Sequence, residues 1–170
     1  GNSSVVRYCQ LFNPVSSMKY FGNRGVSGID GSTSTAAGHA MVQANDLHLM
    51  ITGDTSFFYD SNAFWNEYLK DNLRVIVINN GGGGIFQIID GPKSSEFSEQ
   101  FFAPFQANIS GVAQAYDCDF RSVSTLNELI NAFAPFFTIE ENKRPKILEV
   151  KTSSGENGEV LMRYFDHIKS

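Results

Sequence analysis

The stretch GDTSFFYDSNAFWNEYLKDNLRVIVINNGGGGIF, residues 53–86, decides the fold of this chain. It begins directly after an apolar run at residues 47–51, and a second apolar run at residues 75–78 leads into Asn79-Asn80 and four glycines. The part between the two runs is typical of a helix, so the pattern predicts a strand, a helix and a strand. In a right-handed βαβ unit the two strands are parallel, and their carboxyl ends meet at one edge of the sheet.

Polar groups at that edge suit a hard divalent cation. Asp54 follows the first strand with a carboxylate, and Asn80 follows the second with an amide oxygen. Mg²⁺ prefers about six oxygen ligands, some from protein carboxylates and others from a phosphate. The glycines let the carbonyl of Gly82 face an ion and let backbone N–H groups approach a phosphate. We therefore predict a magnesium and diphosphate site with Asp54, Asn80 and Gly82 as metal ligands. The alternative role for Asp54 is the N-cap of the following helix.

The order Gly-Asp, then Asn-Asn about 26 positions later, resembles the thiamine-diphosphate motif GDG…NN, with Thr55 in place of the last glycine of GDG. Residues 23–38, NRGVSGIDGSTSTAAG, strengthen the likeness. Together they resemble the C-terminal cofactor domain of the 2-succinyl-5-enolpyruvyl-6-hydroxy-3-cyclohexene-1-carboxylate synthase family of menaquinone biosynthesis. The resemblance is dense over residues 1–86 and thins beyond them. It implies thiamine diphosphate as cofactor with Mg²⁺, for which Mn²⁺ is expected to substitute. The implied cofactor-binding residues are Ile29, Gly53, Asp54, Thr55, Ser56, Asn80, Gly81, Gly82, Ile85, Phe86 and Ile89.

The resemblance also assigns roles to the apolar residues of this set. Ile29 matches the aliphatic residue that props the cofactor in a bent conformation, and Ile85 and Phe86 match residues that flank its two rings, with Ile89 one turn further on. Without the surrounding motif, ordinary core packing would explain these side chains equally well.

The family's chemistry is the decarboxylation of 2-oxoglutarate and the addition of the resulting succinic semialdehyde unit to isochorismate. Residues 3–12 read as a helix or a strand, and the resemblance favours a helix with Ser3 and Arg7 one turn apart. Arg7 and Arg24 suit the substrate carboxylates, because a guanidinium binds a carboxylate through two hydrogen bonds and stays charged. Ser3 would add a further hydrogen bond. The alternative is that Ser3 only caps the helix and Arg7 is a solvated cation.

The resemblance implies that part of the active site lies elsewhere. In the family, the glutamate that activates the aminopyrimidine belongs to an N-terminal pyrimidine-binding domain, usually that of a neighbouring subunit. We therefore expect residues 1–170 to be a single C-terminal domain of a longer enzyme that forms a homodimer or homotetramer. The isolated chain is expected to be inactive.

Bulk composition limits the alternatives. The chain has 170 residues, 42% of them hydrophobic, and a net charge of -5. One domain fits this length, and an acidic chain argues against a nucleic-acid surface. No apolar run approaches the roughly 18 residues of a membrane span. Cys9 and Cys118 lack CxxC spacing, so we expect two inert, buried thiols in a reducing compartment and a cytoplasmic location.

The whole pattern predicts an α/β fold with a mainly parallel sheet of about six strands and helices on both faces. Residues 90–105 form a long loop that is either a lid or an excursion, with Phe101 and Phe102 covering substrate or serving subunit contacts. Thr125 is the expected cap of the helix at residues 126–136. The other expected strands are residues 18–21, 47–52, 74–78, 120–123 and 145–151, and the other expected helices are residues 27–44, 56–69, 109–116 and 155–170.

Two other functions remain open at this stage. One is a different thiamine-diphosphate enzyme, such as a 2-oxo-acid decarboxylase or an acetolactate synthase, which would share Gly-Asp and Asn-Asn without needing Arg7 and Arg24. The other is a non-catalytic module that binds phosphate or metal. Asp60 is expected only to pack or to face solvent.

Overall fold

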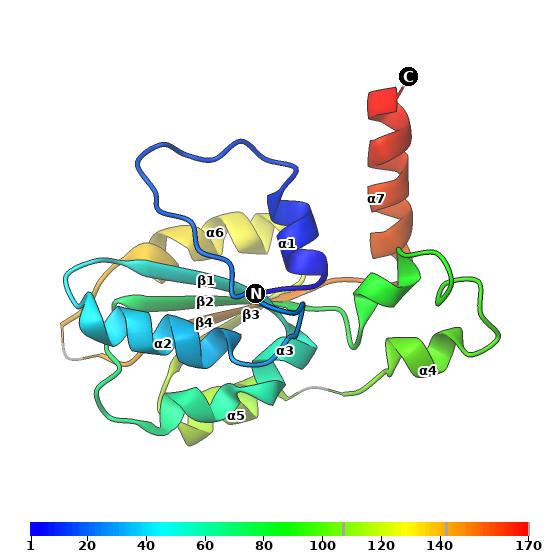
Figure 1. The fold of residues 1–170 in the computed structure, drawn as a ribbon. Helices are drawn as coiled ribbons and strands as arrows, with labels where there is room; N and C mark the ends of the chain where they lie inside the picture. Colours follow the sequence, from blue (N-terminus) through cyan, green and yellow to red (C-terminus); the bar gives the residue numbers. More distant parts are fainter. Residues whose placement is uncertain (107, 142, 170) are drawn as a thin grey trace.

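The computed structural model describes residues 1–106, 108–141 and 143–169. Its centre is a parallel sheet with the strand order β1-β2-β4-β3 (Figure 1). The predicted α/β class and parallel sheet are confirmed, but the described residues form four strands and not about six. The strands are β1 (His48–Gly53), β2 (Leu73–Asn79), β3 (Asp119–Val123) and β4 (Lys146–Lys151).

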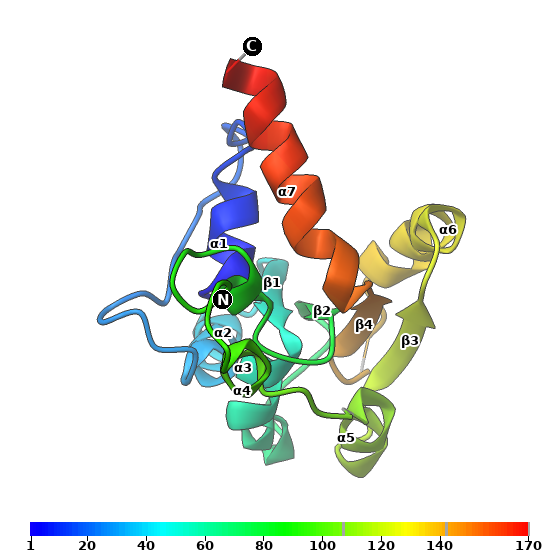
Figure 2. The same cartoon turned by 90° about the vertical axis from the view of Figure 1, so that its right-hand side faces the viewer.

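Helices cover both faces of this sheet, as predicted. Figure 1 shows α2, α3 and α5 below the sheet and α1 and α6 above it, while α7 projects away beside η2. Figure 2 shows the same arrangement from the side, with α7 rising beyond the sheet. The helical elements are α1 (Ser4–Cys9), α2 (Ser32–Val42), α3 (Asp54–Tyr59), η1 (Ser61–Trp65), η2 (Gly84–Gln87), α4 (Ser98–Phe102), α5 (Ile109–Ala115), α6 (Leu126–Phe137) and α7 (Ser154–Lys169).

The two helix layers bury alternate residues of the central strand β2. Val75 and Val77 belong to the core cluster that contains Phe57. Ile76 belongs to a second cluster that contains Phe136 of α6. Successive side chains of a strand point to opposite faces, so a continuous apolar run such as residues 75–78 is what a strand buried on both faces requires.

Helix α6 is held at both of its ends. The Thr125 hydroxyl accepts a hydrogen bond from the Glu128 amide at 3.3 Å, and the Glu128 carboxylate accepts one from the Thr125 amide at 3.2 Å. This capping box confirms Thr125 as the cap. At the other end, the fully buried Arg74 donates to the carbonyl oxygens of Phe136 and, at 2.7 Å, Thr138. A cation there compensates carbonyl groups that have no partner within the helix.

Residues 18–21 do not form the predicted strand. A turn closes just before them, with the Met18 amide donating to the Val15 carbonyl at 3.0 Å, and residues 19–21 have no regular secondary structure. The Phe21 ring packs against His39 of α2 with ring centres 5.1 Å apart. An apolar run becomes a strand only where a neighbouring strand is available for pairing, and this run has none among the described residues.

Three further predictions need correction. The helix expected at residues 56–69 is divided into α3 and η1, because Asp60 leaves the helical conformation with φ -141° and ψ 20°. Residues 90–105 contain a short helix, α4, and are not entirely loop. Cys9 is exposed, so only Cys118 is the expected buried thiol, and burial raises its pKa to about 11. Ser170, the predicted end of the last helix, lies outside the described residues.

None of the helices in the described ranges has the length and apolar character that crossing a membrane requires.

Candidate functional site

The site predicted from the sequence lies where β1 and β2 end. Gly53 and Ile78 are paired in register, so Asp54 and the Asn79-Asn80 pair leave the sheet at the same carboxyl edge. Asp54 is the first residue of α3, and Gly53, not Asp54, is the N-cap of that helix. Only 1% of Asp54 is exposed. A buried carboxylate costs free energy unless it is paired or hydrogen-bonded, so its partners show what it does.

The partners of Asp54 come from both strand ends. Its oxygen Oδ2 accepts hydrogen bonds from the backbone amides of Asn80 at 3.1 Å, Gly81 at 2.7 Å and Gly82 at 3.2 Å. Its oxygen Oδ1 accepts from the Thr55 amide at 2.6 Å and the Thr55 hydroxyl at 3.2 Å. The carboxylate therefore draws the glycine turn at the end of β2 against the first turn of α3.

Glycine is required in this turn. Gly81 has a φ of 76°, a conformation that residues with a side chain rarely adopt. A Cβ atom on Gly82 would lie 2.7 Å from the carbonyl oxygen of Phe102, and one on Gly84 would collide with the side-chain amide of Asn80. The backbone can approach its neighbours this closely only because four consecutive residues have no side chain.

The donor set at this edge fits a magnesium ion with a diphosphate. It combines one buried carboxylate, Asp54, with the side-chain amide of Asn80 and the carbonyl of Gly82, which accepts a hydrogen bond from the Gly84 amide at 3.0 Å. Within the described residues, no hydrogen bond occupies the Asn80 side chain, so its amide oxygen is available as a ligand. These are the oxygen donors that Mg²⁺ takes from proteins when a phosphate supplies the rest. The Asp54 carboxylate already accepts five hydrogen bonds, so a cation would replace some of these donors.

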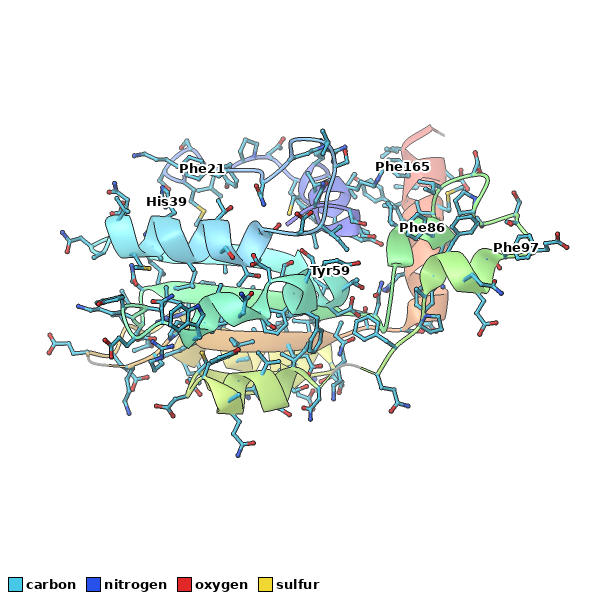
Figure 3. All side chains as sticks on the ribbon, turned by 60° about the horizontal axis from the view of Figure 1, so that its bottom comes forward. Phe21, His39, Tyr59, Phe86, Phe97 and Phe165 are labelled. Carbon is cyan, nitrogen blue, oxygen red and sulfur yellow. The ribbon has the colours of Figure 1, made fainter. Side chains whose placement is uncertain are left out.

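The segment after η2 packs over the glycine turn. The Gly83 amide donates to the Phe102 carbonyl at 2.7 Å, and the Phe105 amide donates to the Gly81 carbonyl at 3.1 Å. The rings of Phe86 and Phe101 lie 5.9 Å apart. Figure 3 shows Phe86 on η2 and Phe97 on the segment that follows, both away from the end of the sheet where Phe21 and His39 lie. Residues 98–105 therefore pack against the glycine turn through backbone hydrogen bonds at Phe102 and Phe105.

An open depression lies beside residues 98–105. Its volume is about 390 Å³, and its lining is Thr55, Phe58, Tyr59 and Phe105. The rings of Phe58 and Phe105 meet edge to face with centres 5.9 Å apart. Thr55, one of the predicted cofactor-binding residues, thus borders a mostly aromatic surface next to the carboxyl edge.

Hydrogen bonds hold the predicted Ile29 segment and the start of α2 against α3 and its C-cap Asp60. The hydroxyl of Ser56 donates to the carbonyl of Ile29. The carboxylate of Asp60 accepts from the amide of Ser34 at 2.6 Å and from its hydroxyl. Asp60 is 8% exposed, so of the two predicted alternatives it packs and does not face solvent, and it is a buried anchor for the first turn of α2. Ile29, Ser56 and Asp54 are therefore brought together at one end of α3.

The three predicted substrate residues lie around the N-terminal helix. Ser3 is the N-cap of α1 with a φ of 63°, and Arg7 is exposed on the same helix one turn later. Arg24 donates to the side-chain oxygen of Asn2 at 3.0 Å, and Asn2 donates to the Gly28 carbonyl at 2.9 Å. The predicted helix is confirmed.

Ile85 and Phe86 lie on η2 and Ile89 follows it, all three half-buried. They are next to the glycine turn in sequence, and Phe86 takes part in the ring pair with Phe101. Helix α7 packs beside them: a Cβ atom on its Gly158 would lie 3.3 Å from the carbonyl oxygen of Gln87.

Asn79 and Glu149 were missed in the sequence. The Asn79 amide group donates to the Glu149 carboxylate at 2.6 Å, and its oxygen accepts from the Gly81 amide at 3.1 Å. Glu149 is 4% exposed. The one available signal was a carboxylate inside the otherwise apolar run at residues 147–150.

Comparisons with known proteins show the family to which this chain belongs. Residues 1–150 match the family model described as thiamine pyrophosphate enzyme, C-terminal TPP binding domain. Proteins named 2-succinyl-5-enolpyruvyl-6-hydroxy-3-cyclohexene-1-carboxylate synthase are similar to the chain: that of Christiangramia forsetii is 44% identical over 100% of this chain and 29% of its own length. The Flavobacterium johnsoniae protein is 42% identical over 98% of this chain and 30% of its own length. The chain thus spans about a third of these relatives.

A solved structure shares the fold. The thiamine diphosphate-dependent 4-hydroxybenzoylformate decarboxylase of Rhodococcus jostii RHA1 matches 69% of this chain and 22% of its own chain, with a TM-score of 0.54 and 21% identity. The likeness to this structure shows the fold alone. The family model and the similarity to the synthases, which covers 98–100% of this chain, also show the family. The chain belongs to the 2-succinyl-5-enolpyruvyl-6-hydroxy-3-cyclohexene-1-carboxylate synthase family of thiamine pyrophosphate enzymes, to whose C-terminal TPP-binding domain it corresponds.

Proposed function

We propose that this chain is the cofactor domain of a Mg²⁺-dependent synthase of menaquinone biosynthesis, which decarboxylates 2-oxoglutarate and adds the succinic semialdehyde unit to isochorismate. The observation that carries the proposal is the Asp54 carboxylate, buried at the carboxyl edge and hydrogen-bonded to three successive amides of the glycine turn. Such an edge is where open α/β sheets bind ligands. The names of the full-length relatives support the choice of reaction.

In this proposal the two strand ends hold the metal and the diphosphate. Asp54 provides the single protein charge, Asn80 a neutral amide oxygen and Gly82 a carbonyl oxygen. Thiamine diphosphate, when bound, supplies the reactive carbon at which 2-oxo acids lose carbon dioxide, and the protein supplies binding and orientation. Mn²⁺ has the same preference for oxygen ligands and is expected to replace Mg²⁺.

Apolar residues next to the turn would keep water from the reacting groups. Ile85, Phe86 and Ile89 follow the glycine turn directly, and Ile29 is tied to α3 through Ser56. Excluding water strengthens every electrostatic interaction in a site, because the local dielectric constant falls.

The substrate carboxylates are assigned to the N-terminal helix. Arg7 is exposed on α1, and the hydrogen bond from Arg24 to Asn2 places the Arg24 guanidinium close to the same helix. Both 2-oxoglutarate and isochorismate carry two carboxylates, and guanidinium groups bind carboxylates through paired hydrogen bonds. Ser3 begins the helix and would donate a further hydrogen bond.

The remaining part of the active site is assigned to another domain. We propose that an N-terminal pyrimidine-binding domain, from a neighbouring subunit of a homodimer or homotetramer, contributes the activating glutamate. The isolated 170-residue chain would then bind the cofactor weakly and show no turnover.

The test is turnover of 2-oxoglutarate plus isochorismate by the full-length protein, with pyruvate as the competing substrate. Consumption of both expected substrates, which stops on chelation and returns with Mg²⁺, supports the proposal. Preference for pyruvate would point to a decarboxylase or an acetolactate synthase. If no 2-oxo acid is consumed although the protein binds thiamine diphosphate, the chain is a binding module and the proposal is wrong.

A further inference from the structure

Glu149 is a buried carboxylate with no established role. It lies on β4, next to Val77 of β2 in register, and is 4% exposed. Its oxygen Oε1 lies 2.6 Å from the side-chain nitrogen of Asn79, while the ammonium of Lys151 is 3.8 Å from Oε2 and largely exposed. A solvated lysine at that distance contributes little. Burying the charge therefore costs free energy, and the hydrogen bond to Asn79 is its main compensation.

The carboxylate determines how the Asn79 amide is oriented. A carboxylate only accepts hydrogen bonds, so the NH₂ group of Asn79 must face Glu149 and its oxygen must face the other way. That oxygen accepts the Gly81 amide at 3.1 Å. The backbone of Asn79 is also fixed, since its carbonyl accepts from the Thr152 amide at 2.9 Å. Glu149 thus acts on Gly81 through an asparagine that has one orientation.

The Gly81 amide is shared with the proposed metal ligand. It lies 2.7 Å from Oδ2 of Asp54 and 3.1 Å from the Asn79 oxygen. When Asp54 coordinates a cation, its oxygens are engaged by the metal and hold the turn less firmly. The Asn79 oxygen remains as acceptor, so the turn keeps one anchor that does not compete with the metal.

We propose that Glu149 is a positioning residue for the cofactor site: through Asn79 it holds the Gly81 amide, and with it the glycine turn, in the conformation that binds the metal and the diphosphate. This inference rests on the proposed function of the turn. The link from Glu149 through Asn79 to Gly81 can nevertheless be tested without any cofactor.

The experiment uses the full-length protein and the variants Glu149→Leu, Glu149→Gln and Asn79→Ala. Calorimetry measures the dissociation constant of thiamine diphosphate at saturating Mg²⁺, and hydrogen exchange without cofactor measures protection of residues 79–84. Changes to residues that orient metal ligands typically cost 10–100-fold in affinity, so we expect a loss of about that size for Glu149→Leu. Glu149→Gln keeps an acceptor for Asn79 and should restore most of the affinity.

A double variant shows whether Glu149 acts through Asn79. If it does, Asn79→Ala combined with Glu149→Leu binds the cofactor about as well as Asn79→Ala alone, because the second change removes nothing further. Glu140→Gln is the matched control. It also removes a carboxylate bonded to a β4 side chain, that of Lys146 at 2.8 Å, but at the other end of the strand. Its affinity and the exchange of residues 79–84 should match the wild type.

Faster exchange confined to residues 79–84 in Glu149→Leu supports the proposal, whereas unchanged exchange there overturns it. Faster exchange throughout the sheet also overturns it, because Glu149 would then serve general stability. If Glu149→Leu does not fold, Asn79→Ala decides instead: faster exchange confined to residues 79–84 supports the link through Asn79, and unchanged exchange there overturns it. Wild-type protein that binds no thiamine diphosphate would contradict the proposed function, while the exchange data would still judge the role of Glu149.

Discussion

Oxygen Oδ2 of Asp54 lies 2.7 Å from the backbone nitrogen of Gly81, although the two residues follow different strands. Pairing of β1 with β2 in parallel brings them together, and the absence of side chains in the glycine turn lets the backbone come so close. The same carboxylate therefore stabilises the turn and presents the one protein charge of the candidate metal site.

Asp54→Asn should abolish calorimetric binding of thiamine diphosphate in the presence of Mg²⁺. The substitution keeps the size of the side chain but removes the charged ligand and an acceptor of several amides. Asp119→Asn, an exposed aspartate at the amino end of β3, is the control and should bind normally. Equal losses in both variants would mean that Asp54 is not a ligand.

Asp60→Ala should lower the free energy of unfolding by about 1–3 kcal/mol, since a buried acceptor is lost and the Ser34 amide and hydroxyl lose their partner. Chemical denaturation measures this. The effect on cofactor affinity should be much smaller than that of Asp54→Asn. A stability equal to that of the wild type would show that α2 does not depend on this anchor.

Arg7→Ala and Arg24→Ala should reduce turnover of the full-length protein while cofactor affinity stays nearly unchanged. Both arginines are exposed in this chain, and a loss on the order of 2–5 kcal/mol is expected when the bound substrate buries its carboxylate against them. Steady-state kinetics with 2-oxoglutarate and isochorismate, beside cofactor titrations, separate the two effects. A variant that loses cofactor affinity but keeps its substrate constants would make that arginine a phosphate ligand.

The stability given by Glu128 should depend on pH. Hydrogen bonds from the Ser124 and Thr125 amides hold the pKa of Glu128 below its ordinary value of 4.5. A lowered pKa in the folded state means that the stabilisation is present above about pH 4.5 and is lost as the pH falls through the folded-state pKa. Denaturation curves of the wild type and Glu128→Gln should therefore differ at pH 6 and converge in acid. A constant difference would contradict the capping role.

The two cysteines should differ in reactivity. Cys9 is exposed, whereas burial raises the pKa of Cys118 to about 11, so little thiolate forms there near neutral pH. Alkylation of native protein at pH 8, followed by peptide mapping, should label Cys9 first and Cys118 only after denaturation. Early labelling of Cys118 would show that its surroundings open readily.

The sequence by itself determined the parallel βαβ unit and the polar residues at the carboxyl edge of its strands. The uninterrupted apolar run at residues 75–78 predicts a central strand, and the glycines that follow it predict a tight turn, because both depend on local chemistry. Asp54, Asn80 and Gly82 could be selected for the same reason: they follow the ends of two neighbouring strands. Thr125 could be predicted as a cap because it precedes a helix-like segment with Asn127 and Glu128 in its first turn.

Tertiary structure decided what depends on partners distant in sequence. Residues 18–21 are apolar enough for a strand but pair with no strand among the described residues. The helix begun at Asp54 ends at Tyr59, where the Asp60 backbone leaves the helical conformation and its carboxylate binds Ser34 of another helix. Glu149 and Asn79 acquire a role only when β4 lies beside β2. Local pattern reports what a segment can form, whereas a buried carboxylate is interpretable only once the folded chain has supplied its hydrogen-bond donors.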